Sequence, residues 1–225
     1  MPSEGSPRRV LAITAPVGLA FIPLGFALGL LVVHAGLAWW WAPVFAAVIY
    51  AGSLEFLMVS LAASAAPIAT VALTTLIVNS RHVFYALSFP LHRVPGLPAK
   101  LYSTYTLSDE AYAVGVSPAA QTWTRRQILL MQAALHALWV SGATLGGLVG
   151  AALPIDRLVG LDFALTALFV VLAIDAYRQR PDPLTAVLAT VIAVAAWILV
   201  PGQMLVAAFA GFTVLLLARM RTRHA

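Results

Sequence analysis

The sequence predicts an all-α protein that crosses a membrane several times. Hydrophobic residues make up 62% of the chain and charged residues only 9%, whereas soluble domains carry about 25% charged residues. The apolar residues form continuous runs of roughly 20 positions, which favours helical spans over the alternating pattern of a β-barrel. The chain has no cysteine, so disulfides and thiol chemistry are excluded.

The net charge of +5 does not indicate nucleic-acid binding, because the basic residues fall between the apolar runs, as they do in membrane proteins. We expect one transporter domain over residues 1–225. Residues 1–9 are predicted to form a polar N-terminal tail and residues 219–225 a basic C-terminal tail. The apolar run after the N-terminal tail is too long for a signal peptide, so we expect it to remain as a span.

The first span is predicted at about residues 10–33. Pro23 removes one helical hydrogen bond within it. Gly25 and Gly29 lie four residues apart, and this spacing of small residues allows a second helix to approach closely. The span is therefore expected to pack against another membrane helix.

The second span is predicted at about residues 42–63, after an aromatic run at residues 39–41 that is typical of a membrane interface. Gly52 and Ser53 are a candidate helix break, whose freed backbone groups could bind an amino acid. Glu55 follows near the middle of the span. An acid at this depth is functional by default, either as a proton or ammonium site or as a partner for a basic residue.

The third span, at about residues 67–89, carries the most unusual polar residues of the chain. Asn79 and His82 are three residues apart and share one helix face. A second stripe lies beside them and consists of Arg81, Tyr85 and Ser88. In lipid these groups are costly, so we expect them to face protein or a water-filled cavity and to be paired.

Residues 91–124 are too polar for a lipid-facing span and too apolar around residues 112–116 for a plain loop. We predict a re-entrant or surface-lying segment between the third and fourth spans. Its two adjacent acids, Asp109 and Glu110, could gate the cytoplasmic mouth or carry a proton. The alternative is a solvated loop.

Four further spans give a predicted total of seven, at about residues 127–153, 158–177, 184–200 and 203–218. Asp162 is expected to cap the fifth span. If residues 101–118 crossed the membrane the total would be eight, and the distribution of basic residues fits both counts.

A weak internal repeat links the first and fourth spans. It pairs Gly25, Leu28 and Gly29 with Gly142, Leu145 and Gly146, at an offset of 117. Because a repeating unit of three spans reverses direction at each copy, we predict a 3+3 inverted repeat plus one helix, an architecture typical of transporters.

Five motifs together resemble the AzlC family of branched-chain amino acid permeases. They occur in the family's order, at residues 23–29, 50–56, 78–85, 107–113 and 160–169. The resemblance implies export of leucine, isoleucine, valine and methionine across a bacterial cytoplasmic membrane, together with a small AzlD-like membrane partner and no cofactor. The family usually carries glutamine at the position of Glu55 and threonine at that of Ser108.

The roles of the polar residues stay open at this point. Arg81 could bind a substrate carboxylate or act as a counter-charge. Its resting partner is predicted to be Glu55, with Asp109 and Glu110 as a mobile gate. His82 could relay protons, although it is more simply a hydrogen-bonded helix residue. Asn79 is expected to join helices, and His136 and Trp139 to contribute packing.

The residues argue against two other function classes. A rhomboid-like protease needs a Gly-x-Ser-Gly motif, but residues 138–142 lack the first glycine, and no His, Asp and Glu have metal-ligand spacing. A non-transporting scaffold would have no need for costly buried charges. We therefore expect a transporter and not an enzyme, with proton coupling as the expected driving force.

Overall fold

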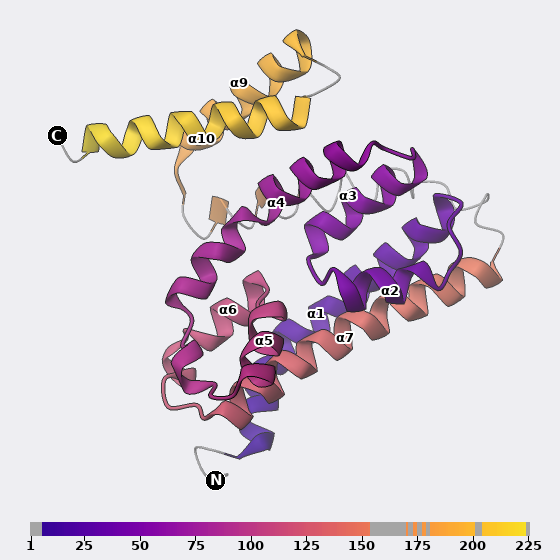
Figure 1. The fold of residues 1–225 in the computed structure, drawn as a ribbon, viewed down its shortest axis with the longest axis vertical. Coiled ribbons are helices and arrows are strands. Elements are labelled where there is room, and N and C mark those ends of the chain that lie inside the picture. The colour runs from indigo at the N-terminus through magenta and orange to yellow at the C-terminus, as the bar shows by residue number, and fades with distance from the viewer. Residues whose placement is uncertain are drawn as a thin grey trace. The chain divides into compact units, whose positions relative to one another are not determined.

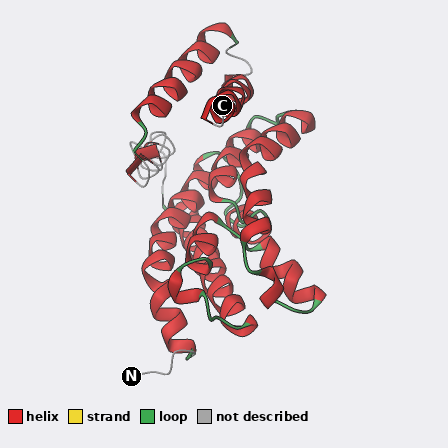
Figure 2. Ribbon diagram, turned by 90° about the vertical axis from the view of Figure 1, so that its left-hand side faces the viewer, coloured by secondary structure: helices red, strands yellow, loops and turns green. Residues whose placement is uncertain are grey.

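The computed structural model describes residues 6–153, 181–200 and 204–223, together with residues 170, 173, 174, 177 and 178. This part of the chain consists of helices joined by turns and contains no strand (Figure 2). It confirms the all-α fold class. Most of the predicted fifth span, including the motif at residues 160–169 and Asp162, lies outside the described residues.

The chain forms two compact units. The first comprises Met1–Ala66 and Val78–Leu161, and the second comprises Pro67–Ile77 and Asp162–Ala225. The prediction of a single transporter domain is not tested by this division. Each unit is described by itself below.

Two helices of 28 residues dominate the first unit, α1 (Pro7–His34) and α7 (Arg125–Ala152). Among the described residues, they are the two helices of sufficient length and apolar character to cross a membrane. Ser6 caps α1 through its hydroxyl, and Thr124 and Gln127 form a capping box at the start of α7. Arg8 and Arg9, predicted to lie in a tail, belong to the first turn of α1.

Glycines let the backbones of α1 and α7 touch, as the spacing of the small residues predicted (Figure 1). A Cβ added at Gly25 would lie 2.7 Å from the carbonyl oxygen of Trp139 and 2.9 Å from the nitrogen of Ala143. At Gly142 it would lie 2.6 Å from the carbonyl oxygen of Ile22. Gly29 and Gly146 face backbone in the same way. α1 continues through Pro23 without ending.

The order of these contacts shows that α1 and α7 run parallel. Gly18 faces Leu135 and Leu138, and Gly25 faces Ala143, so residue numbers increase in the same direction along both helices. Equivalent spans of an inverted repeat run in opposite directions. The inverted relation predicted for this pair is therefore wrong, and the matching glycines instead serve a parallel helix pair.

The predicted second span is two helices, α2 (Trp41–Val48) and α3 (Gly52–Ala63), which confirms the helix break expected at Gly52 and Ser53. Tyr50 has a φ of 46° and Ala51 a φ of −143°, and neither value continues a helix. Figure 1 shows the chain changing direction here, between the two helices. The break lies directly before Gly52 and Ser53, the residues that the sequence marked for it.

The third predicted span is α4 (Ile68–Ser88), within one residue of its expected ends. Residues 91–124 form only short helices, which confirms that the described chain has no long helix there. These are η1 (Leu91–Arg93), α5 (Leu97–Tyr105), α6 (Asp109–Gly115) and η2 (Pro118–Ala120). Whether they enter or lie on a membrane stays a prediction.

In the second unit, α9 (Pro183–Leu199) and α10 (Met204–Arg223) correspond to the sixth and seventh predicted spans. Asp182 caps α9 by accepting from the backbone N–H of Thr185 at 3.0 Å. Arg219, near the end of α10, lies 3.5 Å from the Asp182 carboxylate, so the two helices run antiparallel. The predicted C-terminal tail is thus helical as far as Arg223.

Candidate substrate and ion site

The break between α2 and α3 is closed by a buried acid. The side chain of Glu55 is fully buried and accepts a hydrogen bond from the backbone N–H of Ala51 at 2.8 Å. This bond satisfies a donor that the helix itself leaves without a partner. The indole N–H of Trp139 lies 3.0 and 3.1 Å from the two carboxylate oxygens. Glu55 therefore fastens the start of α3 to α7.

Arg81 pairs with Asp109, and the prediction that Glu55 is its resting partner is wrong. Its Nε donates to the Asp109 carboxylate at 2.9 Å and one terminal nitrogen donates to the Ser53 hydroxyl at 3.1 Å. The prediction rested on equal depth along the two arms of a hairpin, and depth does not fix the direction in which a side chain points. The break instead directs the Glu55 carboxylate toward Trp139, while α6 brings Asp109 up to α4.

The stripe predicted on α4 faces α6 along its length. Tyr85 stacks on Tyr112, with ring centroids 4.6 Å apart and planes 18° apart. The hydroxyls of Ser88 and Tyr112 are 2.9 Å apart. With the Arg81–Asp109 pair, three successive turns of α4 thus contact one short helix, which confirms that this stripe faces protein.

The two acids of the short segment begin helix α6. The Ser108 hydroxyl accepts from the backbone N–H of Ala111 at 3.2 Å and caps the helix. Asp109 and Glu110 occupy the first turn, where the helix dipole favours negative charge. The side chains of Arg81 and Asp109 are 38% and 44% exposed. The pair therefore sits at an accessible edge of the unit rather than in its core.

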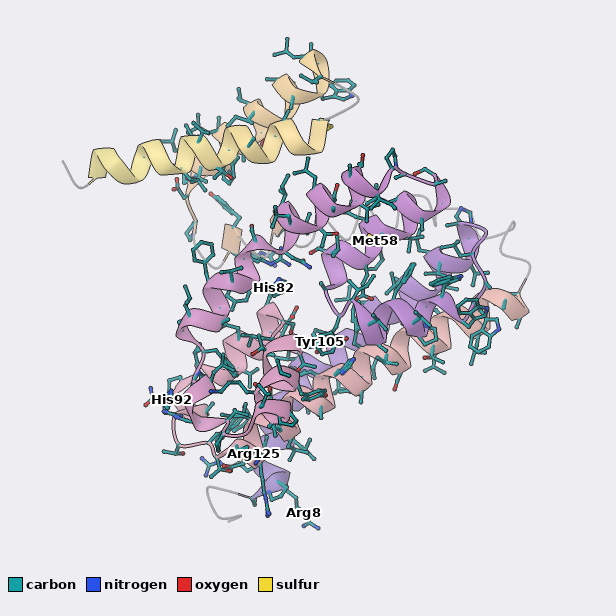
Figure 3. All side chains as sticks on the ribbon, in the orientation of Figure 1. Arg8, Met58, His82, His92, Tyr105 and Arg125 are labelled. Atoms are coloured by element: carbon teal, nitrogen blue, oxygen red, sulfur yellow. The ribbon has the colours of Figure 1, made fainter. Side chains whose placement is uncertain are left out.

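Asn79 and His82 share a face, as predicted, but bond within their own helix. The Nδ1 atom of His82 lies 3.2 Å from the backbone oxygen of Asn79, and its ring meets Tyr85 edge-on at 5.6 Å. His82 is labelled in Figure 3. The amide oxygen of Asn79 is buried without a hydrogen-bond partner in the described part of the chain.

Gly52, at the start of α3, packs against Trp139 of α7. A Cβ at this position would come within 3.3 Å of the Trp139 ring. The α2–α3 break, Glu55, Ser53, Arg81 and Asp109 are thus joined by direct contacts, with Trp139 at one end and α6 at the other. We call this set the break network.

Sequence reasoning missed Trp139 as the donor to Glu55, since it was expected only to pack. The two residues are 84 positions apart, and no local pattern links them. Tyr112 was also missed as the stacking partner of Tyr85. A tyrosine three residues after an acid pair gives no distinct signal on its own.

The chain is similar in sequence to several known proteins. Residues 16–153 match the family model described as AzlC protein. The branched-chain amino acid transport protein AzlC of Bacillus subtilis is 30% identical over 87% of this chain and 78% of its own length. An uncharacterized membrane protein of Helicobacter pylori is 30% identical over 80% of each chain.

A more distant relative is the inner membrane protein YgaZ of Escherichia coli, 24% identical over 73% of this chain and 71% of its own. No solved structure matches this chain. The named membrane relatives and the apolar helices α1 and α7 together support a membrane location. A family model matches more than half of the chain, and a named relative is 30% identical over most of both chains. The chain therefore belongs to the AzlC family.

Proposed function

We propose that this chain exports branched-chain and other neutral aliphatic amino acids, among them leucine, isoleucine, valine and methionine, across a bacterial cytoplasmic membrane. The observation that carries the proposal is the similarity over 87% of the chain to the branched-chain amino acid transport protein of B. subtilis. The helix break supports it, because broken helices supply the backbone groups that bind substrates in transporters.

The break network suits a transport cycle. Substrate has to reach the break from alternate sides, so one contact of the network must open. The Arg81–Asp109 pair is the accessible contact, whereas Glu55 is fully buried. We assign the gate to movement of α6 away from α4, which separates Arg81 from Asp109 and Tyr85 from Tyr112.

Protons are the proposed driving ion. Glu55, Asp109 and Glu110 are the candidate carriers in the first unit. Glu55 accepts hydrogen bonds from two donors at rest, and Asp109 faces Arg81. Measuring transport at two pH gradients in variants of each acid separates these candidates.

A small AzlD-like membrane protein is the proposed partner. This proposal rests on the family resemblance and on the lipid-compatible surface of the chain, which exposes large apolar residues such as Phe84 and Leu87 on α4. Full transport by the purified single chain in liposomes would count against an obligatory partner, whereas co-purification with activity only in the complex would support it.

A proteolytic function is not favoured. The Ser141 side chain is exposed on α7, and its hydroxyl donates to the backbone oxygen of Ala137 at 2.6 Å. This back-bonding is the ordinary role of a serine within a helix. Ser141→Ala is accordingly expected to leave every activity unchanged, and it serves as the control variant below.

The test uses cells that lack other exporters and are fed a leucine-containing dipeptide. Expression of the chain with its partner should lower internal leucine, and Ser141→Ala should do the same. Arg81→Ala should not, because it removes the residue that joins α4 to α6 and to Ser53. Unchanged internal levels of every aliphatic amino acid would remove the proposal.

A further inference from the structure

Four polar side chains near the helix break, three of them buried and His136 half-buried, carry atoms without a well-formed hydrogen bond to the described residues. The atoms are the Tyr50 hydroxyl, the Ser103 hydroxyl, the Gln132 amide oxygen and Nε2 of His136. Ser103 and Gln132 are 0% exposed and Tyr50 is 5% exposed. Such atoms are rare in folded proteins, because each one loses its bonds to water without replacement.

These four residues form one group, which we call the polar cluster. The rings of Tyr50 and His136 are 4.5 Å apart, and the Tyr102 hydroxyl lies 3.4 Å from Nδ1 of His136. The Gln132 side-chain N–H donates to the backbone oxygen of Ser103 at 2.7 Å. Gln132 and His136 are four residues apart and share a face of α7.

The cluster meets the helix break directly. Tyr50 is the residue with a φ of 46° that ends α2. Tyr105, labelled in Figure 3, donates to the backbone oxygen of Ala47 in the last turn of α2, and its ring meets that of His136 edge-on at 5.9 Å. A residue placed in a strained conformation with its hydroxyl unbonded is a common feature of a binding site.

The chemistry of the cluster favours a cationic group. Gln132 offers an acceptor, and the hydroxyls of Tyr50 and Ser103 can accept as well. Aromatic rings attract a cation through their faces. Trp139, one turn beyond His136 on the same helix, holds the Glu55 carboxyl group, which adds two oxygen acceptors to this side of α7.

We propose that the polar cluster binds the α-ammonium group of the transported amino acid. This inference rests on the proposed function and names the part of the substrate that the site recognises. An ammonium group brings three N–H donors, which match oxygen acceptors left without a well-formed hydrogen bond by the described part of the chain. A buried water could fill the same role, and the experiment is designed to separate the two.

The test measures binding of radiolabelled leucine to the full chain, purified together with its small partner, in lipid nanodiscs. Tyr50→Phe and Ser103→Ala each delete one hydroxyl oxygen and keep the rest of the side chain. Each should weaken leucine binding about two- to tenfold, the value of one hydrogen bond. Thermal stability of Ser103→Ala without leucine should not fall, because the deleted hydroxyl has no hydrogen-bond partner among the described residues. Ser141→Ala should bind like the wild type.

Analogues give a second readout on the wild-type chain, which holds even if a variant fails to fold. Leucine methyl ester keeps the ammonium group and should compete with leucine, whereas N-acetyl-leucine lacks it and should not. If N-acetyl-leucine competes as well as leucine, or both variants bind leucine like the wild type, the assignment is wrong and the cluster holds only water. If the wild type binds no aliphatic amino acid at all, the proposed function falls first, and this assignment with it.

Discussion

Replacing Gly25 by alanine tests how tightly α1 and α7 are joined. The added Cβ would lie 2.7 Å from the Trp139 carbonyl oxygen and 2.9 Å from the Ala143 nitrogen. Ordinary contact begins at about 3.4 Å, so the helices must separate by about 0.7 Å. Both obstacles are backbone atoms of a 28-residue helix, which cannot turn aside as a side chain can.

Overpacking of this kind costs about 1–3 kcal/mol, and a rigid obstacle puts Gly25→Ala at the upper end. For a chain of this length that corresponds to a fall in the unfolding midpoint of roughly 5–10 °C. The assay is thermal unfolding of the purified chain in detergent, and the measured signal is the fraction of protein that remains monomeric after heating.

Gly18→Ala is the matched control, since it makes the same change in the same helix. Its Cβ would lie 2.6 Å from Cδ1 of Leu138, which is the far end of a flexible side chain and can rotate away. We expect a loss well below that of Gly25→Ala. Equal midpoints for the two variants, or a wild-type midpoint for Gly25→Ala, would refute the argument that backbone contact holds the pair.

The remaining predictions concern the break network. Glu55→Gln should fold and lose about 1 kcal/mol of stability at most, because the amide oxygen can still accept from Ala51 and Trp139. Trp139→Phe should cost about 1–3 kcal/mol, because it leaves a buried carboxyl group with one donor. If Glu55→Gln lowers the unfolding temperature more than Trp139→Phe does, Glu55 is not the anchor between α3 and α7. The side chains of the Arg81–Asp109 pair are more than one-third exposed, so a double-mutant cycle on stability should give a coupling free energy of about 1 kcal/mol or less. Either alanine variant should nevertheless abolish transport. A strong coupling together with normal transport would identify a structural pair and not a gate. If Asp109→Asn loses its response to the pH gradient and Glu55→Gln keeps it, the proton is carried at α6; the opposite result assigns it to Glu55.

The long elements could be predicted from the sequence because each depends on nearby residues. Apolar runs gave α1, α4 and α7 to within a few residues, and the spacing of Gly25 and Gly29 predicted close helix packing. The break before Gly52 was marked by small and polar residues. The sequence did not show that Tyr50, two residues before Gly52, makes the turn in a left-handed conformation.

The pairings of the site could not be predicted because they join distant residues. Depth along an assumed hairpin suggested Glu55 for Arg81, but the break redirects Glu55 to Trp139. The direction of α7 was likewise hidden, since a matching glycine pattern fits a parallel pair as well as an inverted repeat. The polar cluster draws its residues from three separate segments, the break, α5 and α7, so no sequence motif predicts it.

The central claim is that this AzlC-family chain moves neutral aliphatic amino acids, and flux of radiolabelled leucine in proteoliposomes tests it most directly. The chain is reconstituted with its small partner, and leucine movement is measured at two pH gradients in competition with a panel of amino acids. The account predicts flux that isoleucine, valine and methionine inhibit, that charged amino acids leave unchanged, and that the pH gradient accelerates. Absence of flux for every aliphatic amino acid, with a well-folded complex in the membrane, would contradict it.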